Sequence, residues 1–412
     1  MALTVEKLND DTTFLLAFAP PFTPRKAGRK FPGAFTILID PWLAGRSSIL
    51  HPAFQVSHHT SDCVLKSLAD LQEQPDLVII SQDKPDHCHK ETLCTLPSDT
   101  STRILATPAA AKKIWSWKHF DSSIVHVMKP YNAQKPETVI KISVPAYTSS
   151  SSKGQITIAN VPTRRDMTGL HNAIGITYRP PGSMLTAFEG ELIKLTDMMN
   201  PSSTSPMLHK ACSAIKLTEP ASSPPPALPN RPRTTSSPRP VFLDPLGRAQ
   251  RLPEHPALRT TNGRDRADSK LDRPETRAHK EKTLSVLYTP HGVSYTTLSS
   301  YIDRHLRPTA AGAPLTALFH SINTEENPWF MGGIVANGAP GGTVIARQLR
   351  AKHWISAHDE LKDNRGMATT WIKSKQYTVG EVEQMLKEGQ IWKDADTQVH
   401  ALGVGESMRI DG

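Results

Sequence analysis

Short apolar runs alternate with amphipathic stretches along most of the chain. The runs have the length and β-branched content of strands, and some are apolar at every position, as in strands buried on both faces. In the first half they lie at 12–18, 35–40, 76–81, 102–107, 139–144, 155–161 and 173–179. Residues 60–73 and 108–117 carry apolar side chains at helical spacing, so we expect a helix at each. The alternation of strands and helices predicts an α/β fold.

A segment of different composition separates two ordered blocks. Residues 198–282 hold about 14 of the 35 prolines together with many serines and arginines. Such a segment buries too little apolar surface to offset the entropy of ordering, so we expect a disordered insertion. It is either a solvated surface loop or a docking segment for a protein partner. The blocks 1–197 and 283–412 then form one domain, because neither completes a repeating unit alone.

The net charge of +9 and the pI near 9.3 come mostly from this insertion, and the rest of the chain is near neutral. We therefore expect no nucleic-acid partner. No apolar run reaches the roughly 18 residues of a membrane span, and the first residues do not resemble a signal peptide. The four cysteines lack the spacing of a disulfide framework, which predicts reduced thiols and a cytoplasmic location.

Polar groups suited to metal binding or catalysis directly follow several predicted strands. They are Asp40, the nonapeptide 81–89, His291 and the pair His358–Asp359, with His171 in a loop before a strand as a further candidate. In α/β folds, functional side chains gather where strands give way to loops. Histidine and carboxylate are common ligands of first-row divalent metals.

The order of these groups resembles the metallo-β-lactamase-fold superfamily, in particular a fungal branch related to the ascorbate-phosphate lactonase-like group. The motif of that superfamily is a strand followed by [ST]-H-x-H-x-D-H. Ser81 opens the motif here, and Asp86 and His87 match its closing Asp-His. Gln82 and Lys84 occupy the positions of its first two histidines.

The resemblance implies a four-layer αβ/βα sandwich. It also implies a metal-dependent hydrolase acting on an ester, lactone, amide or phosphodiester, that is, on a small-molecule substrate. The metal ligands it implies are Asp86, His87, His291 and His358, with His171 as an additional candidate. Because the first half of the motif is altered, we expect one divalent metal, zinc in the first place, with iron and manganese as alternatives.

The candidate catalytic residues are Lys84 and Asp86. A single metal would lower the pKa of a bound water and provide hydroxide as the nucleophile. The Lys84 ammonium would polarise a carbonyl or phosphoryl oxygen where the second metal is lost. Asp40 either braces the loops or binds metal, and Asp359 or His89 could orient a ligand imidazole. The alternative function is a catalytically inactive binding or scaffold protein that keeps the fold.

Overall fold

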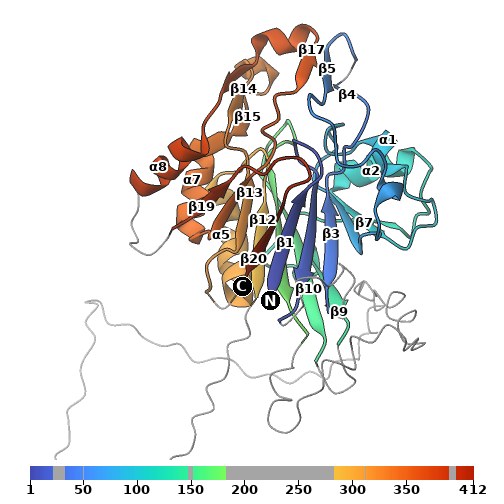
Figure 1. Cartoon of the computed structure of the whole chain (residues 1–412), viewed down its shortest axis with the longest axis vertical. Helices are drawn as coiled ribbons and strands as arrows, with labels where there is room; N and C mark the ends of the chain where they lie inside the picture. Colours follow the sequence, from blue (N-terminus) through green and yellow to red (C-terminus); the bar gives the residue numbers. More distant parts are fainter. Residues whose placement is uncertain (22–32, 50, 147–151, 182–282, 311, 389–395) are drawn as a thin grey trace, which may run out of the picture. The chain divides into compact units, whose positions relative to one another are not determined.

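Two seven-stranded sheets pack face to face at the centre of the protein (Figure 1). This computed structural model describes residues 1–21, 33–49, 51–146, 152–181, 283–310, 312–388 and 396–412, so the predicted insertion at 198–282 lies outside the described residues. The sheets have the strand orders β20-β1-β2-β3-β6-β7-β8 and β19-β16-β13-β12-β11-β10-β9. Each sheet combines parallel and antiparallel pairs.

Strands from both ordered blocks contribute to both sheets. The first sheet contains β1 (Ala2–Lys7), β2 (Phe14–Ala19), β3 (Phe35–Ile39), β6 (Leu77–Ile80), β7 (Arg103–Ala106), β8 (Val125–Val127) and β20 (Ser407–Asp411). The second contains β9 (Val139–Val144), β10 (Gly154–Pro162), β11 (Asn172–Arg179), β12 (Leu284–Tyr288), β13 (Ala317–His320), β16 (His353–Ser356) and β19 (Gln398–His400). The expected strands are therefore present.

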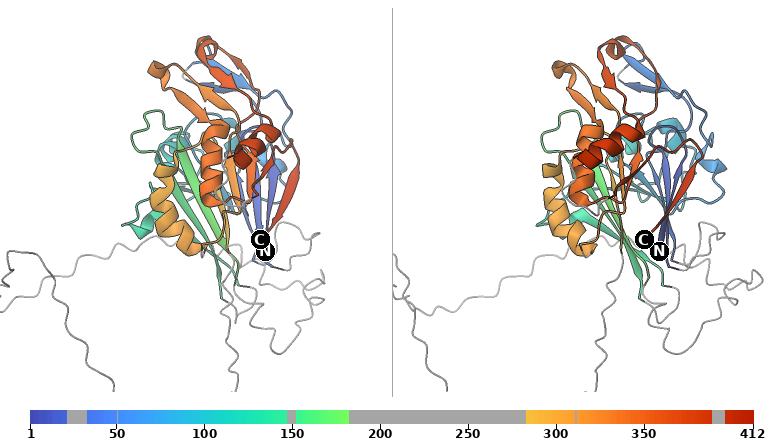
Figure 2. Two further views of the ribbon diagram at one scale, coloured as in Figure 1. Left: turned by 90° about the vertical axis from the view of Figure 1, so that its left-hand side faces the viewer. Right: turned by 60° about the vertical axis from the view of Figure 1, so that its left-hand side comes forward.

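Helices cover the outer faces of the two sheets (Figure 2). The first sheet is covered by α1 (Lys90–Leu93) and α2 (Pro108–Ser116). The second is covered by α5 (Tyr295–Tyr301), η4 (Ile302–Leu306), α6 (Arg307–Thr309), α7 (Gly338–Leu349) and α8 (Val379–Glu388). This confirms the expected four-layer αβ/βα sandwich. None of the described helices is long and apolar enough to cross a membrane.

The continuous apolar runs of the sequence match strands that are buried on both faces. In β6, Leu77 and Ile79 pack against the other sheet, whereas Val78 and Ile80 pack under the helices. The parallel neighbours β3, β6 and β7 of the first sheet, and β12, β13 and β16 of the second, end in loops at the same end of the sandwich.

Two small sheets lie at this end of the sandwich, at the top of Figure 1. One has the order β15-β14-β18, and the other has the order β17-β5-β4. Their strands are β4 (Ser47–Ile49), β5 (Gln55–His58), β14 (Thr324–Glu326), β15 (Ile334–Asn337), β17 (Asp363–Arg365) and β18 (Lys373–Lys375). Short 3-10 turns complete the fold at η1 (Leu68–Asp70), η2 (Pro136–Thr138), η5 (Trp329–Met331) and η6 (Met367–Trp371).

The helix expected at 60–73 is wrong, because this segment contains only the turn η1. Its backbone groups bond to side chains rather than along a helix. The amide of Leu68 donates to Thr95 Oγ1 at 2.9 Å, and the Leu68 carbonyl accepts from Gln74 Nε2 at 3.1 Å. Leu71 is already extended, with φ −62° and ψ 125°. Leu68 and Leu71 are buried although the backbone path is irregular. Their spacing therefore matched that of an amphipathic helix without a helix being present.

Candidate metal centre

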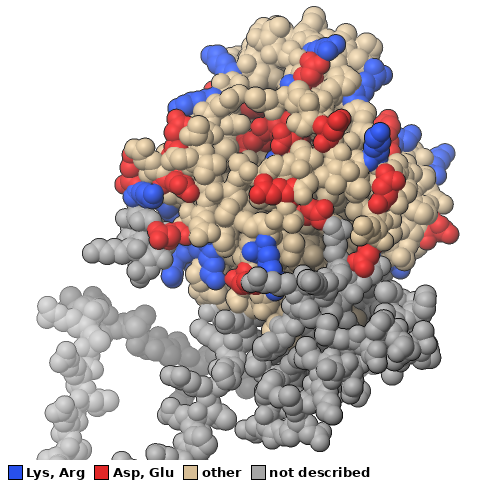
Figure 3. Space-filling model, viewed as in Figure 1, with Lys and Arg blue, Asp and Glu red and all other residues tan. Residues whose placement is uncertain are grey.

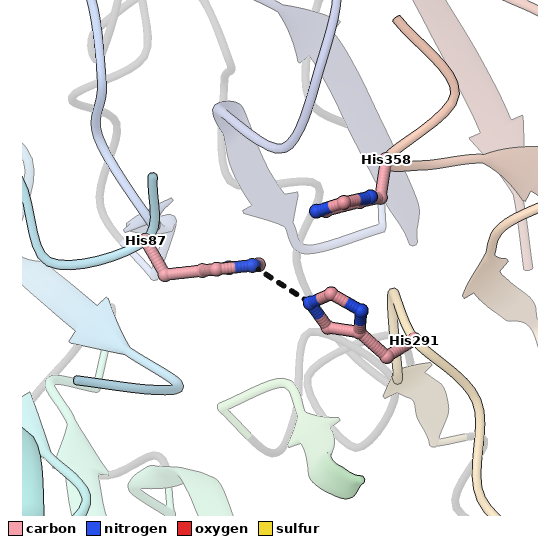
Figure 4. Close-up of side chains that lie close together, drawn as sticks. All are labelled: His87, His291 and His358. Atoms are coloured by element: carbon pink, nitrogen blue, oxygen red, sulfur yellow. Dashed lines mark hydrogen bonds between the residues drawn. The ribbon is translucent and has the colours of Figure 1, made fainter. Parts of the chain in front are cut away.

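Three histidines converge where strands of both large sheets end (Figure 4). His87 lies in the loop after β6, whereas His291 and His358 follow β12 and β16. Each offers a ring nitrogen within 4.8 Å of those of the other two, and the rings point toward one another. The centre therefore joins the first sheet to the second.

The hydrogen bonds of His87 and His291 define their tautomers. His87 Nδ1 lies 2.8 Å from Asp40 Oδ2, and His291 Nδ1 lies 3.0 Å from the carbonyl oxygen of Val335. Both oxygens accept, so each Nδ1 carries the hydrogen and each Nε2 of a neutral ring presents a lone pair. These two Nε2 atoms are only 3.1 Å apart. Two facing lone pairs require a proton or a cation between them.

Burial keeps the proton off His291. His291 is 2% exposed, and burial, followed by the nearby His358 and His87, holds the pKa of His291 well below its usual value. A neutral His291 opposite the Nε2 of His87 is the arrangement that a metal ion satisfies. This approach of two ring nitrogens, with His358 beside them, is thus an observation in favour of a cation site.

Asp40 holds the His87 ring in place. It lies at the end of β3, is fully buried, and has a left-handed backbone with φ 43°. Its carboxylate accepts from the Ser81 amide at 2.7 Å, from the Tyr288 hydroxyl at 2.8 Å, and from the Ser81 hydroxyl as well as His87. Of the two roles expected for Asp40, this geometry favours orienting a ligand over binding metal.

Asp86 adds a carboxylate to the three imidazoles. Its Oδ2 lies 3.4 Å from His358 Nε2 and 3.9 Å from His87 Nε2. Burial alone would raise the pKa of Asp86, but His87, Lys362 and His358 together keep it well below its usual value. His358 adopts a left-handed backbone with φ 68°, a strained conformation of the kind found at functional sites. Asp86 thus lies beside two of the three converging histidines.

Two charged residues at the centre were missed by the sequence analysis. Asp11 lies in the turn between β1 and β2, and Lys362 immediately precedes β17. Lys362 Nζ lies 2.8 Å from Asp11 Oδ2 and 3.5 Å from Asp86 Oδ2. Asp11 is fully buried and the Lys362 side chain is 8% exposed. Neither residue directly follows one of the apolar runs of the sequence, so no sequence signal distinguishes them from ordinary turn residues.

The charges of this group suit one divalent cation. Three buried or nearly buried carboxylates, Asp11, Asp40 and Asp86, face one ammonium, Lys362. When a metal ion replaces any protons on the imidazoles, the three carboxylates and the one ammonium leave two negative charges, which one divalent ion neutralises. Three imidazoles and a carboxylate are also a donor set that zinc accepts. The residues present therefore fit the expected metal.

A family model that matches part of this chain agrees with this architecture. Residues 30–180 match the family model described as a beta-lactamase superfamily domain. The fold is the metallo-β-lactamase fold. No curated protein matches this chain in sequence.

Several solved structures match over nearly the whole chain. An isothiocyanate hydrolase from Delia radicum gut bacteria is 12% identical, with a TM-score of 0.45 and coverage of 99% of this chain and 100% of that one. A protein described as a possible metal-dependent hydrolase from Veillonella parvula is 12% identical, with a TM-score of 0.43 and coverage of 99% of each chain. A metallo-beta-lactamase fold protein from Bacillus subtilis is 8% identical, with a TM-score of 0.38 and coverage of 98% and 99%.

Gln82, at the position of the first motif histidine, and the candidate ligand His171 make other contacts in this chain. Gln82 is buried and its Nε2 donates to the carbonyl oxygen of Leu170 at 3.0 Å. Both ring nitrogens of His171 lie 2.9 Å from carbonyl oxygens, those of Gly292 and Ile334. These contacts join loops around the centre and leave neither ring nitrogen of His171 directed at the three converging histidines.

Lys84 borders a cavity of about 110 Å³ beside the centre. Its Nζ lies 3.4 Å from Asp83 Oδ1, and its side chain is 28% exposed. The cavity is also lined by Asp86, His291 and His358, by the charged residues Glu325, Glu360 and Lys362, and by residues of the two small sheets. The small sheets of this metallo-β-lactamase fold therefore form the walls of the entrance.

Asp359 and His89, the other residues considered as orienting groups, contact different parts of the fold. Asp359 accepts from the backbone amides of Ile322 and Asn323, each at 2.8 Å. His89 caps α1 by accepting from the amide of Thr92 at 3.2 Å. They stabilise the loops on either side of the centre, whereas Asp40 orients His87.

Proposed function

We propose that this protein is a metal-dependent hydrolase with a mononuclear centre formed by His87, His291, His358 and Asp86. The observation that carries the proposal is the 3.1 Å approach of the Nε2 atoms of His87 and His291, each with its Nδ1 bonded to an acceptor. Zinc suits this donor set, and iron and manganese are the alternatives. A divalent cation held there supplies Lewis acidity and lowers the pKa of water.

The protein's own groups prepare the site for this chemistry. Asp40 and the Val335 carbonyl fix the two tautomers, so both Nε2 atoms are available before any ligand arrives. We assign to Lys84, at the edge of the cavity, the polarisation of a carbonyl or phosphoryl oxygen of the substrate. Asp86 remains ionised beside His358. With Lys84, it is the second residue to which we assign a catalytic role.

We propose an ester, lactone, amide or phosphodiester of a small molecule as the substrate. A cavity of about 110 Å³ is smaller than the roughly 300–1,000 Å³ that enclose a whole drug-sized ligand, so it admits only the reacting group. The remainder of the substrate would lie along the small sheets. Among the described residues on the face shown in Figure 3, acidic and basic side chains are interspersed rather than gathered in one basic patch.

We also propose a cytoplasmic location. Three cysteines in the described part of the chain, Cys63, Cys88 and Cys94, are unpaired. Unpaired thiols are usual where the environment is reducing.

Elemental analysis of the purified protein tests the metal centre. Wild type is compared with the double variant His87→Ala/His358→Ala, and with His119→Ala as a control, since His119 bonds to Leu96 in the outer layer. We expect one metal per chain in wild type and control, and none in the double variant. Two metals would contradict a mononuclear centre.

Turnover of esters, lactones, amides and phosphodiesters by the metal-loaded protein tests the reaction. No metal after incubation with zinc, iron or manganese, or no turnover by the loaded protein, would favour the alternative of a catalytically inactive binding or scaffold protein. The altered motif positions Gln82 and Lys84 are the observation that supports that alternative.

A further inference from the structure

A second set of possible metal ligands overlaps the first. Asp11, Asp86 and His358 offer donor atoms that lie within 4.8 Å of one another. Two of these residues also belong to the proposed centre, and Asp11 is contributed by the turn between β1 and β2. Considered by donors alone, this set could hold another divalent cation.

Lys362 already brings a positive charge to this second set. Its Nζ lies 2.8 Å from Asp11 Oδ2, 3.5 Å from Asp86 Oδ2 and 3.5 Å from His358 Nε2. The ammonium thus approaches all three residues of the set. Its ion pair with the buried carboxylate of Asp11 holds the ammonium in this position.

The surroundings of Lys362 fix its side chain there. The residue lies next to β17, which pairs with β5, and its Nζ is 5.5 Å from the centre of the Trp42 ring. Asp11 is held by its turn, where Asn9 Oδ1 accepts from the amides of Asp11 and Thr13 at 3.0 and 2.8 Å. The ion pair is therefore built by two distant segments and is not a flexible surface contact.

We propose that Lys362 is a built-in cation that takes the place of a second metal ion and limits the centre to one. The inference rests on the proposed function, because it assumes that His87, His291, His358 and Asp86 hold a divalent ion. A divalent ion bound by Asp11 would lie against the Lys362 ammonium and be repelled. With Lys362 present, one divalent ion neutralises the centre. Without Lys362, the added negative charge attracts a second ion.

Metal counting in Lys362 variants tests this role. Purified proteins are dialysed against zinc or manganese, and metal per chain is measured by elemental analysis. We expect wild type and Lys362→Arg to hold one ion and Lys362→Met to hold two. Lys84→Met is the matched control, since Lys84 borders the same cavity without contacting Asp11, and it should hold one. Asp11→Asn added to Lys362→Met should restore one.

The melting temperature of the metal-free protein is a second measurement. Lys362→Met leaves Asp11 and Asp86 without their ammonium, so its melting temperature without metal should fall below that of wild type. Added zinc should raise it by more than in wild type. If Lys362→Met does not fold, Lys362→Gln serves instead, because its amide still donates a hydrogen bond toward Asp11.

The outcomes separate this inference from the proposed function. One ion in wild type and still one in the folded Lys362 variants would overturn the role of Lys362 and leave the mononuclear centre intact. No ion in wild type would overturn the proposed function. It would overturn the role of Lys362 as well, because that role assumes that the four ligands hold one ion.

Discussion

Asp40 controls the tautomer of His87 through a single oxygen. In Asp40→Asn, the amide oxygen can keep its bond with the Ser81 amide, which places the NH₂ group opposite His87 Nδ1. Two donors then face each other, so the ring hydrogen of His87 moves to Nε2 and blocks the metal. We expect zinc affinity to fall by roughly 10–100-fold. Competition titration against a chelator measures this change.

Asp359→Asn is the matched control for Asp40. Asp359 is a loop carboxylate close to His358 in sequence, but its bonds go to the backbone of residues 322 and 323 and to Ser356. This variant should lose stability and keep its zinc affinity. A folded Asp40→Asn protein with the affinity of wild type would show that Asp40 does not set the tautomer.

A variant of Lys84 distinguishes an effect on metal binding from an effect on turnover. Its ammonium borders the cavity but is bonded to Asp83, outside the converging histidines. Lys84→Met should therefore keep one metal per chain, and kcat should fall roughly 10²–10³-fold, as when one electrostatic group is removed from an active site. Steady-state kinetics on the best substrate, with metal content measured in parallel, checks both. Unchanged kcat would remove Lys84 from the catalytic residues.

At the level of single residues, position relative to strands was the useful sequence signal. Asp40, His87, His291 and His358 each follow a strand closely, and the structure brings them together because strands of both sheets end at the same place. Asp11 and Lys362 reach the centre from a hairpin turn and from the segment before β17. Their importance depends on tertiary packing, which spacing along the chain does not encode.

At the level of elements, helix α7 packs unusually close to strand β16. A Cβ added at Gly342 would lie 2.3 Å from ring atoms of Trp354, which is fully buried. Gly342→Ala should therefore force α7 away from the sheet and lower the free energy of unfolding by roughly 1–3 kcal/mol. Urea denaturation of the purified variant measures this loss.

Helix α8 contains the control for Gly342. Gly380 is also helical, but a Cβ there meets no heavy atom within 4 Å. Gly380→Ala should leave stability unchanged or raise it by up to about 1 kcal/mol, because alanine favours the helix. Equal losses in the two variants would mean that contact with Trp354 is not the cause.

The elements that the sequence predicted best are the strands whose formation is dominated by burial of apolar side chains. The apolar runs at 35–40 and 76–81 became β3 and β6 because burial on both faces leaves no alternative. The segment 60–73 failed as a helix because its backbone found side-chain partners, Thr95 and Gln74, that are outside any local pattern. Tertiary hydrogen bonds thus overrode helical spacing.

At the level of the whole molecule, the pairing of distant strands was beyond the sequence analysis. Strand β20, at the end of the chain, pairs with β1 at its start, and β12 pairs with β11 across the predicted insertion. The resemblance in motif order implied this sandwich, whereas hydrophobic periodicity gives strands but not their partners. The two sheets are held by a shared apolar core and, at one end, by the candidate metal centre.

A metal at this centre should stabilise the whole fold, because His87 belongs to one half of the sandwich and His291 and His358 to the other. Binding to the folded state alone adds about 2.7 kcal/mol at a zinc concentration of 100 times Kd. Zinc should therefore raise the melting temperature of the metal-free wild type, and a chelator should reverse the rise. His87→Ala and His358→Ala should each abolish most of the increment, since each removes one of the four proposed donors. His119→Ala should retain it. If the single variants kept the full increment, the stabilising ion would have to bind elsewhere on the protein, and the two halves would be joined by their apolar core alone.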